Sequence, residues 1–327
     1  MKNALMMAVS VAALGAASVA GAEELRLSHQ WSTQDIRHQV AQIVADEVAA
    51  ADVDLDIKIF PSQSLFKARE QYRPLSRGRL DMTVLPLSYA AGDRPEYHLS
   101  LMPGLVRNHA HAARLVESPF MEELEAVMAQ DDVMVLVHGY LAGGFAGVDR
   151  CITAPEDVEG LSIRAAGASF DQMLAGAGGS IASMASSEIY SAMQTGVLDA
   201  ANTSSSSFVS FRIYEQVSCY TPAGETALWF LYQPLLMNRS TFEDLNEEQQ
   251  AALLAAAEVA QAYYFENAAL EDARSVEVFT EAGVEIAEIS PEEFEAWRAL
   301  AAETSYAEFV ENYPDGQALL DLALSVE

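Results

Sequence analysis

The sequence predicts an α/β protein with two lobes, a cleft between them and one long helix that bridges both. Three observations lead to this prediction. Strand and helix patterns alternate in two separate parts of the chain, an unbroken helix pattern lies near its end, and the chain is long. Without residues 1–22, about 305 residues remain (327 minus 22), which is more than one hydrophobic core usually serves.

The first α/β unit lies between residues 24 and 86. Its expected elements are a strand over 24–28, a helix over 36–48, a strand over 53–59, a helix over about 65–79 and a strand over 81–86. Ser32 or Thr33 is the expected N-cap of the first helix, and Pro61 stops the second strand. This order predicts a mostly parallel sheet covered on both faces.

The second unit starts with a buried strand at 133–140. Further strands are expected over 161–166 and 197–202, with a helix over 186–196 that Gly196 ends. Between them lies the glycine-rich sequence GYLAGGFAG (139–147). It fits either a tight turn or a crossing between lobes where backbone comes close to a ligand.

A helix pattern continues from Asn246 to Ala282. Asn246 with Gln249 forms a capping box, and Gly283 follows as a stop signal. A helix of this length spans roughly 55 Å, more than a single lobe needs, so we expect it to run across both lobes. A coiled coil is the alternative, but 251–264 lacks a sustained heptad.

Residues 1–22 have the pattern of a secretory signal peptide. Lys2 is followed by an apolar run from Ala4 to Ala20, and small residues precede a predicted cleavage after Ala22. An uncleaved anchor is the alternative, because the run is near the lower length limit of a membrane span. The formal charge of −30 opposes binding to nucleic acid or anionic lipid. We therefore expect an exported, soluble protein with an acidic surface.

Two cysteines, Cys151 and Cys219, are present in a chain expected to enter an oxidising compartment. A disulfide between them would close a long loop and stabilise the fold. Two free buried thiols are the alternative, since spacing does not show whether the two backbones approach each other.

The sequence carries no convincing catalytic or metal-binding pattern. His109 and His111 are close in sequence but have no third ligand at a suitable spacing, and 167–171 (GASFD) fails the GxSxG pattern at its last position. We expect no catalytic residues, no metal and no cofactor.

Arg164 interrupts an apolar strand, where an unpaired guanidinium is costly. It fits either a structural salt bridge or a clamp for a ligand carboxylate, which its planar fork matches. Asn202 and Thr203 end the next strand and could add neutral hydrogen bonds. Aromatic residues that could wall an apolar pocket are Trp31, Tyr89, Phe145 and Trp229.

Several segments together resemble the solute-binding proteins of tripartite ATP-independent periplasmic (TRAP) transporters. The most specific are PEDVEGLSIRAAG (155–167) and SEIYSAMQTGVLDAANT (187–203), and similar order and spacing appear over 60–82 and after 245–250. The resemblance covers nearly all of the chain after residue 22.

The resemblance implies a periplasmic receptor that closes by a hinge on a small organic acid and delivers it to membrane permease subunits. It places Arg164 where the family's arginine pairs with the ligand carboxylate, and Arg69 near the cleft. The expected lobes are 23–146 plus about 235–275, and 147–234 plus about 276–327. We expect a monomer.

Two departures from the family pattern narrow the expected ligand. Ala146 stands where many members carry a second arginine, and Asn202 stands where a glutamate is common and can help to hold a cation. A pocket with one arginine and little other charge favours a monocarboxylate over sialic acid and argues against a metal. The alternative functions are a secreted hydrolase and a sensor subunit that presents its ligand to a membrane kinase.

Overall fold

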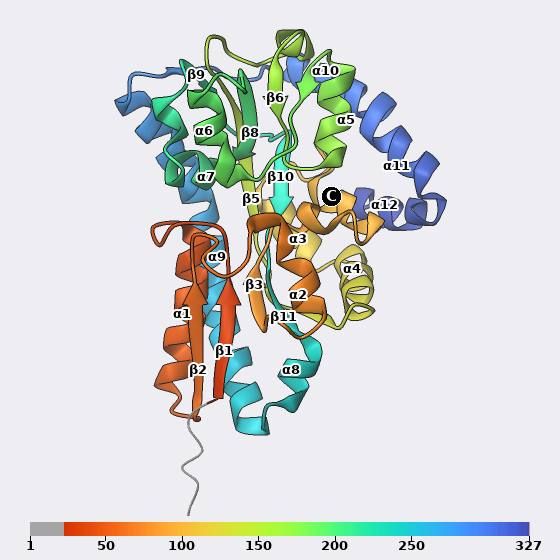
Figure 1. Cartoon of the computed structure of the whole chain (residues 1–327). Helices are drawn as coiled ribbons and strands as arrows, with labels where there is room; N and C mark the ends of the chain where they lie inside the picture. Colours follow the sequence, from red (N-terminus) through yellow and green to blue (C-terminus); the bar gives the residue numbers. More distant parts are fainter. Residues whose placement is uncertain (1–22, 327) are drawn as a thin grey trace, which may run out of the picture.

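The computed structural model describes residues 23–326, which form two lobes, each built on one β-sheet (Figure 1). We call the lobe around the five-stranded sheet lobe I and the lobe around the seven-stranded sheet lobe II. Within the described range, no helix combines the length and the apolar character needed to cross a membrane. The expected signal peptide and its cleavage after Ala22 lie outside the described residues.

Lobe I contains a sheet with the strand order β2-β1-β3-β11-β4. Its strands are β1 (Glu23–Ser28), β2 (Leu55–Phe60), β3 (Met82–Val84), β4 (Val133–Val137) and β11 (Leu235–Asn238). Its helices are α1 (Ile36–Ala50), α2 (Tyr72–Ser76), α3 (His109–Val116), α4 (Pro119–Ala129) and α8 (Arg239–Asp244), with short turns of helix η1 (Ala68–Glu70), η2 (Leu87–Ala90) and η3 (Pro95–Leu101).

Lobe II contains a sheet with the order β12-β9-β5-β8-β6-β7, in which β10 also pairs with β5. Its strands are β5 (Tyr140–Gly147), β6 (Ser162–Arg164), β7 (Ser180–Ile181), β8 (Ala200–Ser204), β9 (Cys219–Thr221), β10 (Trp229–Tyr232) and β12 (Glu285–Ile286). Its helices are α5 (Ala168–Gly176), α6 (Ile189–Gln194), α7 (Ser205–Ser210) and α10 (Pro291–Ala301), with η4 (Pro155–Val158), η5 (Ser186–Glu188) and η6 (Ile213–Glu215).

Both sheets are mixed, whereas the sequence predicted a mostly parallel arrangement. The pairs β1–β2, β1–β3, β6–β7, β6–β8 and β9–β12 are parallel. The pairs that involve β5 with β8, β9 or β10, and β11 with β3 or β4, are antiparallel. The difference arises because β5, β10 and β11 belong to the connections between the lobes, and these connections return in the opposite direction to the βαβ units.

The glycine-rich segment is a strand and not a tight turn. In β5, all eight residues are buried. A side chain at Gly143 would place its Cβ 2.0 Å from the carbonyl oxygen of Thr203, and one at Gly144 would come within 1.9 Å of that of Thr221. The missing side chains therefore let β5 pack tightly against β8 and β9 where the chain passes from lobe I to lobe II.

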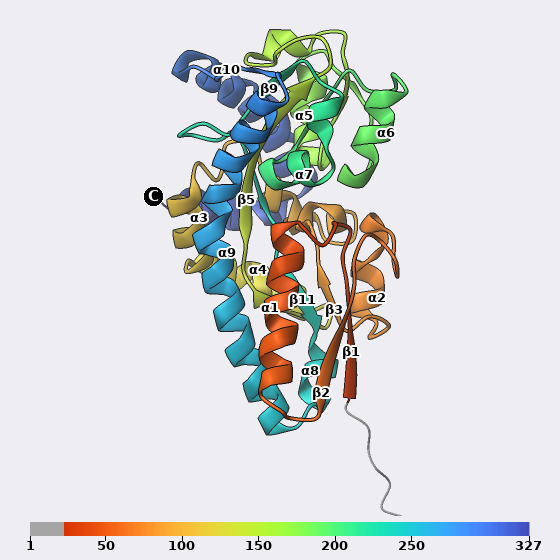
Figure 2. The ribbon, with the colours of Figure 1, turned by 90° about the vertical axis from the view of Figure 1, so that its left-hand side faces the viewer.

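Helix α9 (Glu247–Glu281) runs along both lobes, as the sequence predicted (Figure 2). It contacts α1 and β4 in lobe I, and α7, β5 and β12 in lobe II. Its capping box forms as expected, with the Asn246 side chain accepting from the amide of Gln249, and Gly283 follows with φ +77°.

The C-terminal segment does not stay with lobe II. It continues through a π-helical turn (Ala302–Tyr306), α11 (Ala307–Asn312), η8 (Pro314–Gly316) and α12 (Gln317–Leu324). Helix α12 packs against α4, and Leu320 joins the core cluster that contains Phe120 and Leu124. The lobe boundaries given above therefore remain a proposal, and the last helix packs with lobe I.

Two local predictions were wrong. The helix expected over 65–79 is only α2 with the turn η1 before it. Pro74 permits a helix only if it lies in the first turn, because its ring would clash with the carbonyl four residues earlier. The N-cap of α1 is Asp35, not Ser32 or Thr33, and its carboxylate accepts from the amide of Arg37.

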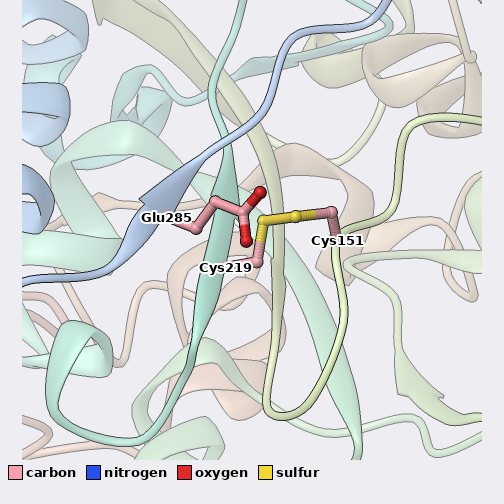
Figure 3. A group of neighbouring side chains, drawn as sticks. All are labelled: Cys151, Cys219 and Glu285. Atoms are coloured by element: carbon pink, nitrogen blue, oxygen red, sulfur yellow. A yellow bond between two sulfur atoms is a disulfide. The ribbon is translucent and has the colours of Figure 1, made fainter.

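Cys151 and Cys219 form a disulfide, with their Cα atoms 5.0 Å apart (Figure 3). It ties the segment that follows β5 to β9. Glu285 lies beside it on β12, which pairs with β9. These three residues do not form a metal site in this state, because the two sulfur atoms are bonded to each other and not present as thiolates.

The double variant Cys151→Ser/Cys219→Ser should remain folded but lose stability. The bond closes a loop with a sequence separation of 68 residues. The chain-entropy model then gives about 4 kcal/mol less free energy of unfolding without the bond. Urea denaturation monitored by circular dichroism measures this loss, and a difference below about 1 kcal/mol would contradict the prediction.

Candidate functional site

A small cavity lies between the two lobes and contains about 180 Å³ of empty volume. Its walls come from both lobes, and strand β10 of the lobe II sheet contributes to them. The lining residues are Arg37, Pro86, Tyr89, Arg164, Ala166, Ser186, Thr203, Ser204, Ser207, Trp229, Leu231 and Gln233. The residues that would contact a ligand here therefore come from parts of the chain that are far apart in sequence.

Arg164 lies at the end of β6, is fully buried and is held by three oxygen atoms, none of them from a carboxylate. Its Nε donates to the Met184 carbonyl at 3.1 Å, its Nη1 to the Asn202 carbonyl at 2.7 Å and its Nη2 to the Tyr89 hydroxyl at 2.9 Å. Within residues 23–326 no acid lies in ion-pair contact with it. The structural salt bridge that the sequence left open is therefore absent from this arrangement.

This arrangement leaves part of the guanidinium available. A guanidinium has five N–H donors, and three are used, so one remains on each terminal nitrogen. Burial lowers the pKa of Arg164, but an arginine remains protonated in proteins. The cavity therefore contains a positive charge that has neutral hydrogen-bond partners only.

The pKa of the Tyr89 hydroxyl reflects the positive charge of two neighbouring arginines. Burial alone would raise the pKa of its hydroxyl, but Arg164 and Arg69 outweigh that effect and lower the pKa. The Arg69 guanidinium stacks 4.6 Å from the Tyr89 ring centroid and donates to the Met184 carbonyl in lobe II at 3.1 Å. Both arginines therefore favour negative charge near this hydroxyl.

A second buried arginine, Arg37 on α1, was not predicted as a site residue. Its Nε and Nη2 bind the two carboxylate oxygens of Asp35, each at 2.7 Å, and both side chains are almost fully buried. Its guanidinium stacks 3.8 Å from the Trp31 ring centroid. Because Asp35 neutralises it, Arg37 adds donors but no net charge beside the cavity.

Arg37 also connects the lobes through the serine run at the start of α7. It donates to the hydroxyls of Ser204, Ser206 and Ser207, at 3.2, 2.8 and 2.9 Å. The sequence did contain a signal for it, since Arg37 lies on the buried face of α1 with Ala41, Val44 and Val48. An arginine on an apolar helix face needs partners in the same way as one in an apolar strand.

The site residues predicted from the sequence fall into two groups. Tyr89, Arg164, Thr203 and Trp229 line the cavity. The other four lie outside the lining. Asn202 holds Arg164 through its main-chain carbonyl, and Phe145 stacks on Trp297 with ring centroids 5.5 Å apart. Trp31 stacks on Arg37, and Arg69 stacks on Tyr89. Gln233 and Arg37 are lining residues that sequence reasoning missed.

Two histidines, His29 and His38, lie next to Trp31, on which Arg37 stacks. The Trp31 amide donates to His29 Nδ1, and His29 Nε2 lies 3.0 Å from His38 Nδ1. Burial, then His38 and Arg37, lower the pKa of His29 to about 3, against an opposing effect of Asp35. The pKa of His38 is also lowered, mainly by burial.

The His109–His111 pair does not form a metal site. His109 Nε2 binds Asp272 on α9 at 2.7 Å, whereas His111 Nδ1 accepts from the Arg107 amide at 3.3 Å, and the His111 amide donates to Asn108 at the start of α3. These contacts tie α3 to α9 and cap α3, so the two histidines have structural partners on different elements.

The chain matches the model of DctP, described as bacterial extracellular solute-binding protein family 7, over residues 27–312. A solute-binding protein of Albidiferax ferrireducens is 33% identical over 291 residues, which cover 87% of this chain and 86% of that protein. The 2,3-diketo-L-gulonate-binding periplasmic protein YiaO of Escherichia coli is 26% identical, with 95% and 94% covered.

Solved structures agree with this match. A TRAP periplasmic solute-binding protein from Rhodoferax ferrireducens with bound malonate superposes with a TM-score of 0.89 at 32% identity, covering 92% of this chain and 98% of that one. DctP7 of Bordetella pertussis, a receptor that binds pyroglutamic acid, gives 0.84 at 22% identity, with 92% and 99% covered. The second likeness concerns the fold alone.

Acid should weaken the fold through His29. Its pKa is near 6.5 in the unfolded chain and about 3 in the folded one, so below pH 6.5 the unfolded state binds a proton that the folded state does not. Between pH 7 and 4.5 this lowers the free energy of unfolding by on the order of 2 kcal/mol. Urea titrations should show that His29→Gln reduces the drop by about that amount.

The matched control for this measurement is Thr33→Ala, which changes an exposed side chain near the cluster in sequence and removes no titratable group. It should keep the acid dependence of the wild type. An equal acid dependence in His29→Gln and wild type would contradict the assignment of the proton to His29.

Arg37 and Asp35 should show strong coupling in stability. Arg37→Met leaves a buried carboxylate without its counter-charge, which costs about 3–5 kcal/mol. Asp35→Asn should destabilise the wild type but stabilise the Arg37→Met variant, because it removes the unpaired charge while keeping an N-cap side chain. A double-mutant cycle of unfolding free energies tests this reversal of sign, and simple additivity would refute it.

Proposed function

The chain belongs to family 7 of the bacterial extracellular solute-binding proteins, the TRAP receptors, and we propose that it captures a small organic acid between its lobes through Arg164. The observation that carries this proposal is the state of the guanidinium. It is buried, it has no carboxylate partner among residues 23–326, and it keeps one N–H on each terminal nitrogen. A ligand carboxylate supplies both the missing charge and two acceptor oxygens.

The charge around the cavity supports a monocarboxylate. No acidic residue lines it, and the charge of Arg37 is already balanced by Asp35. Arg164 is thus the one cation of the lining without an ion-pair partner, and one carboxylate balances it. Burying a second carboxylate would add a charge with no counter-charge in the lining.

The lining side chains leave little free space in this arrangement of the lobes. A small acid would therefore need less separation of the lobes than a large one, which supports a small ligand. Related TRAP receptors are recorded with malonate, with pyroglutamate and with glucuronate or galacturonate, so the family accepts acids of different sizes. For this chain, the limited space between the lobes favours the smaller end of that range.

Ligand capture would be coupled to closure of the two lobes. Contacts already join them around the cavity: Tyr89 accepts from the Ser186 amide at 3.0 Å, and Gln63 donates to Ser187 at 3.1 Å. A ligand that binds Arg164 from one lobe and Tyr89 from the other favours the closed state through contacts that the open state lacks. The closed receptor would then deliver the acid to the membrane subunits of a TRAP transporter, after export and removal of the signal peptide.

The alternative of a secreted hydrolase is set aside, because this family consists of binding proteins and not enzymes. The serine run that could have suggested a nucleophile has another role. Ser204, Ser206 and Ser207 accept hydrogen bonds from a guanidinium, which cannot act as a general base.

Arg164→Ala should abolish binding of small carboxylates without unfolding the protein. In a thermal-shift panel, a ligand at one hundred times its dissociation constant stabilises the wild type by about 2.7 kcal/mol. The variant should show no shift with the same ligand, and Arg164→Lys should show a reduced one because it keeps the charge but loses the planar fork.

Arg298→Ala is the matched control, since Arg298 is exposed on α10 and pairs with Glu295 only three residues away. It should respond to ligands like the wild type. If Arg164→Ala keeps the ligand response, the carboxylate assignment is wrong.

A further inference from the structure

The Cys151–Cys219 disulfide and Glu285 form a side-chain cluster that the proposed function does not use. One ligand atom from each of the three residues lies within 4.8 Å of the other two, and Figure 3 shows the Glu285 carboxylate beside the sulfur atoms. Cys219 is buried, Cys151 is half-buried and Glu285 is exposed. The cluster therefore lies at the surface of lobe II, where dissolved ions have access to it.

Strand pairing holds two of these side chains together without the disulfide. Cys219 on β9 is the register partner of Glu285 on β12, and the Glu285 amide donates to the Ser218 carbonyl at 2.9 Å. Register partners on adjacent strands point to the same face of a sheet, with their strands about 4.8 Å apart. On its other edge β9 pairs with β5, where Cys219 lies opposite Gly147. Breaking the S–S bond would leave this ladder of hydrogen bonds in place.

The position of Cys151 also has causes other than the disulfide. A Cβ at Gly147 would lie 2.0 Å from the Arg150 carbonyl oxygen, so the absent side chain lets the chain fold back over the sheet at this point. Ile152, the residue after Cys151, is 1% exposed and packs in the core of lobe II. The reduced cysteine would therefore stay next to Cys219.

Reduction would turn this cluster into a set of three metal ligands. A dithiol gives two electrons and two protons to the S–S bond, becomes a disulfide itself and leaves two thiols on the protein. Each thiol releases its proton when it binds a metal ion. Two thiolates and one carboxylate suit Zn²⁺, which accepts three protein ligands and one water in a tetrahedral arrangement.

The movement that such a site requires is small. Two sulfur atoms that bind one tetrahedral Zn²⁺ lie roughly 3.8 Å apart, so the bonded pair must separate by roughly 2 Å. Cys151 lies outside the strands, and a rotation of its side chain supplies this change. Glu285 is exposed, so its side chain is free to bring an oxygen atom to the metal.

We propose that the reduced protein binds one thiophilic divalent cation, with Zn²⁺ as the type, through Cys151, Cys219 and Glu285, and that this site and the disulfide exclude each other. An exported chain is synthesised where thiols are kept reduced, so after export a metal ion and an oxidant compete for the same two sulfur atoms. The formal charge of −30 raises the concentration of cations at the surface. This inference goes beyond the proposed function and does not depend on it.

Metal titration of the reduced mature protein tests the site. The protein is reduced with dithiothreitol in urea, then refolded and freed of the reductant without oxygen, and circular dichroism verifies the fold. Competition with a chromophoric chelator should show one Zn²⁺ per chain, bound more tightly than by the oxidised protein by on the order of a hundredfold or more. Equal binding by both forms, or loss of the native spectrum on reduction, would overturn the proposal.

Co²⁺ and Mg²⁺ identify the ligand atoms by their chemistry. Co²⁺ should give a thiolate-to-metal charge-transfer absorption with the reduced protein, and Cys151→Ser should lower its intensity because one thiolate is missing. Mg²⁺ prefers oxygen ligands and should not displace Zn²⁺. A Co²⁺ complex without charge-transfer absorption would show that the metal binds to surface carboxylates and not to the cysteines.

Glu285→Gln tests the third ligand, since it removes the charge and keeps the size of the side chain. In the reduced protein the affinity for Zn²⁺ should fall by on the order of tenfold or more. Glu288→Gln is the matched control, because Glu288 is exposed three residues further along the chain and does not belong to the cluster. Equal affinities of these two variants would refute the three-ligand site.

Reoxidation by glutathione disulfide tests the exclusion between metal and disulfide. Glutathione disulfide takes two electrons from the two cysteines, which form their S–S bond again, and leaves as two thiols. The thiolate is the nucleophile of this exchange, so one equivalent of Zn²⁺ should slow the reaction by on the order of tenfold, whereas Mg²⁺ should not. The same rate with either metal would show that Zn²⁺ does not occupy the two sulfur atoms.

Discussion

The arrangement of this protein around its cleft depends on a buried arginine that has no carboxylate partner in the described part of the chain. Arg164 is held by two main-chain carbonyls and a phenol oxygen, which fix the position of the guanidinium without cancelling its charge. A carboxylate of the protein bound to this guanidinium would compete with an anionic ligand. The neutral partners instead leave a desolvated cation in place, and under the proposed function a bound acid would balance its charge.

Arg37 shows the opposite solution in the same cavity wall. Its charge is neutralised by Asp35, and the remaining donors hold Gln233 and the serine run of α7. The pair therefore orders the polar groups of both lobes while adding no net charge. The two arginines therefore differ in their partners. Arg164 is held by neutral oxygen atoms only, whereas Arg37 is paired with Asp35 and also donates to neutral side chains. Under the proposed function, this division would let the strongly acidic chain, with a formal charge of −30, present a local site for an anion.

Much of the fold could be predicted because its signals are local. The capping box and the stop at Gly283 defined α9 within a residue or two, and the alternation of β1 and β2 was visible in the sequence. The wrong predictions have two kinds of cause, one local and one long-range. Pro74 shortened α2, whereas the antiparallel crossings of β5, β10 and β11 depend on how the chain returns between the lobes. Strand direction in such crossings is set by pairing between distant segments, which periodicity does not report.

The sequence by itself determined the two-lobe α/β class, the bridging helix and the position of Arg164 in an apolar strand. An apolar run, a helix cap and a charge in a strand are all properties of neighbouring residues. Only the tertiary structure decided what surrounds that arginine. It excluded an acidic partner, paired Cys151 with Cys219, brought Arg37 and Gln233 to the cavity and placed Phe145 and Trp31 outside its lining. These outcomes depend on which residues meet across the two lobes, and contacts between segments more than one hundred residues apart leave no periodic trace in the sequence.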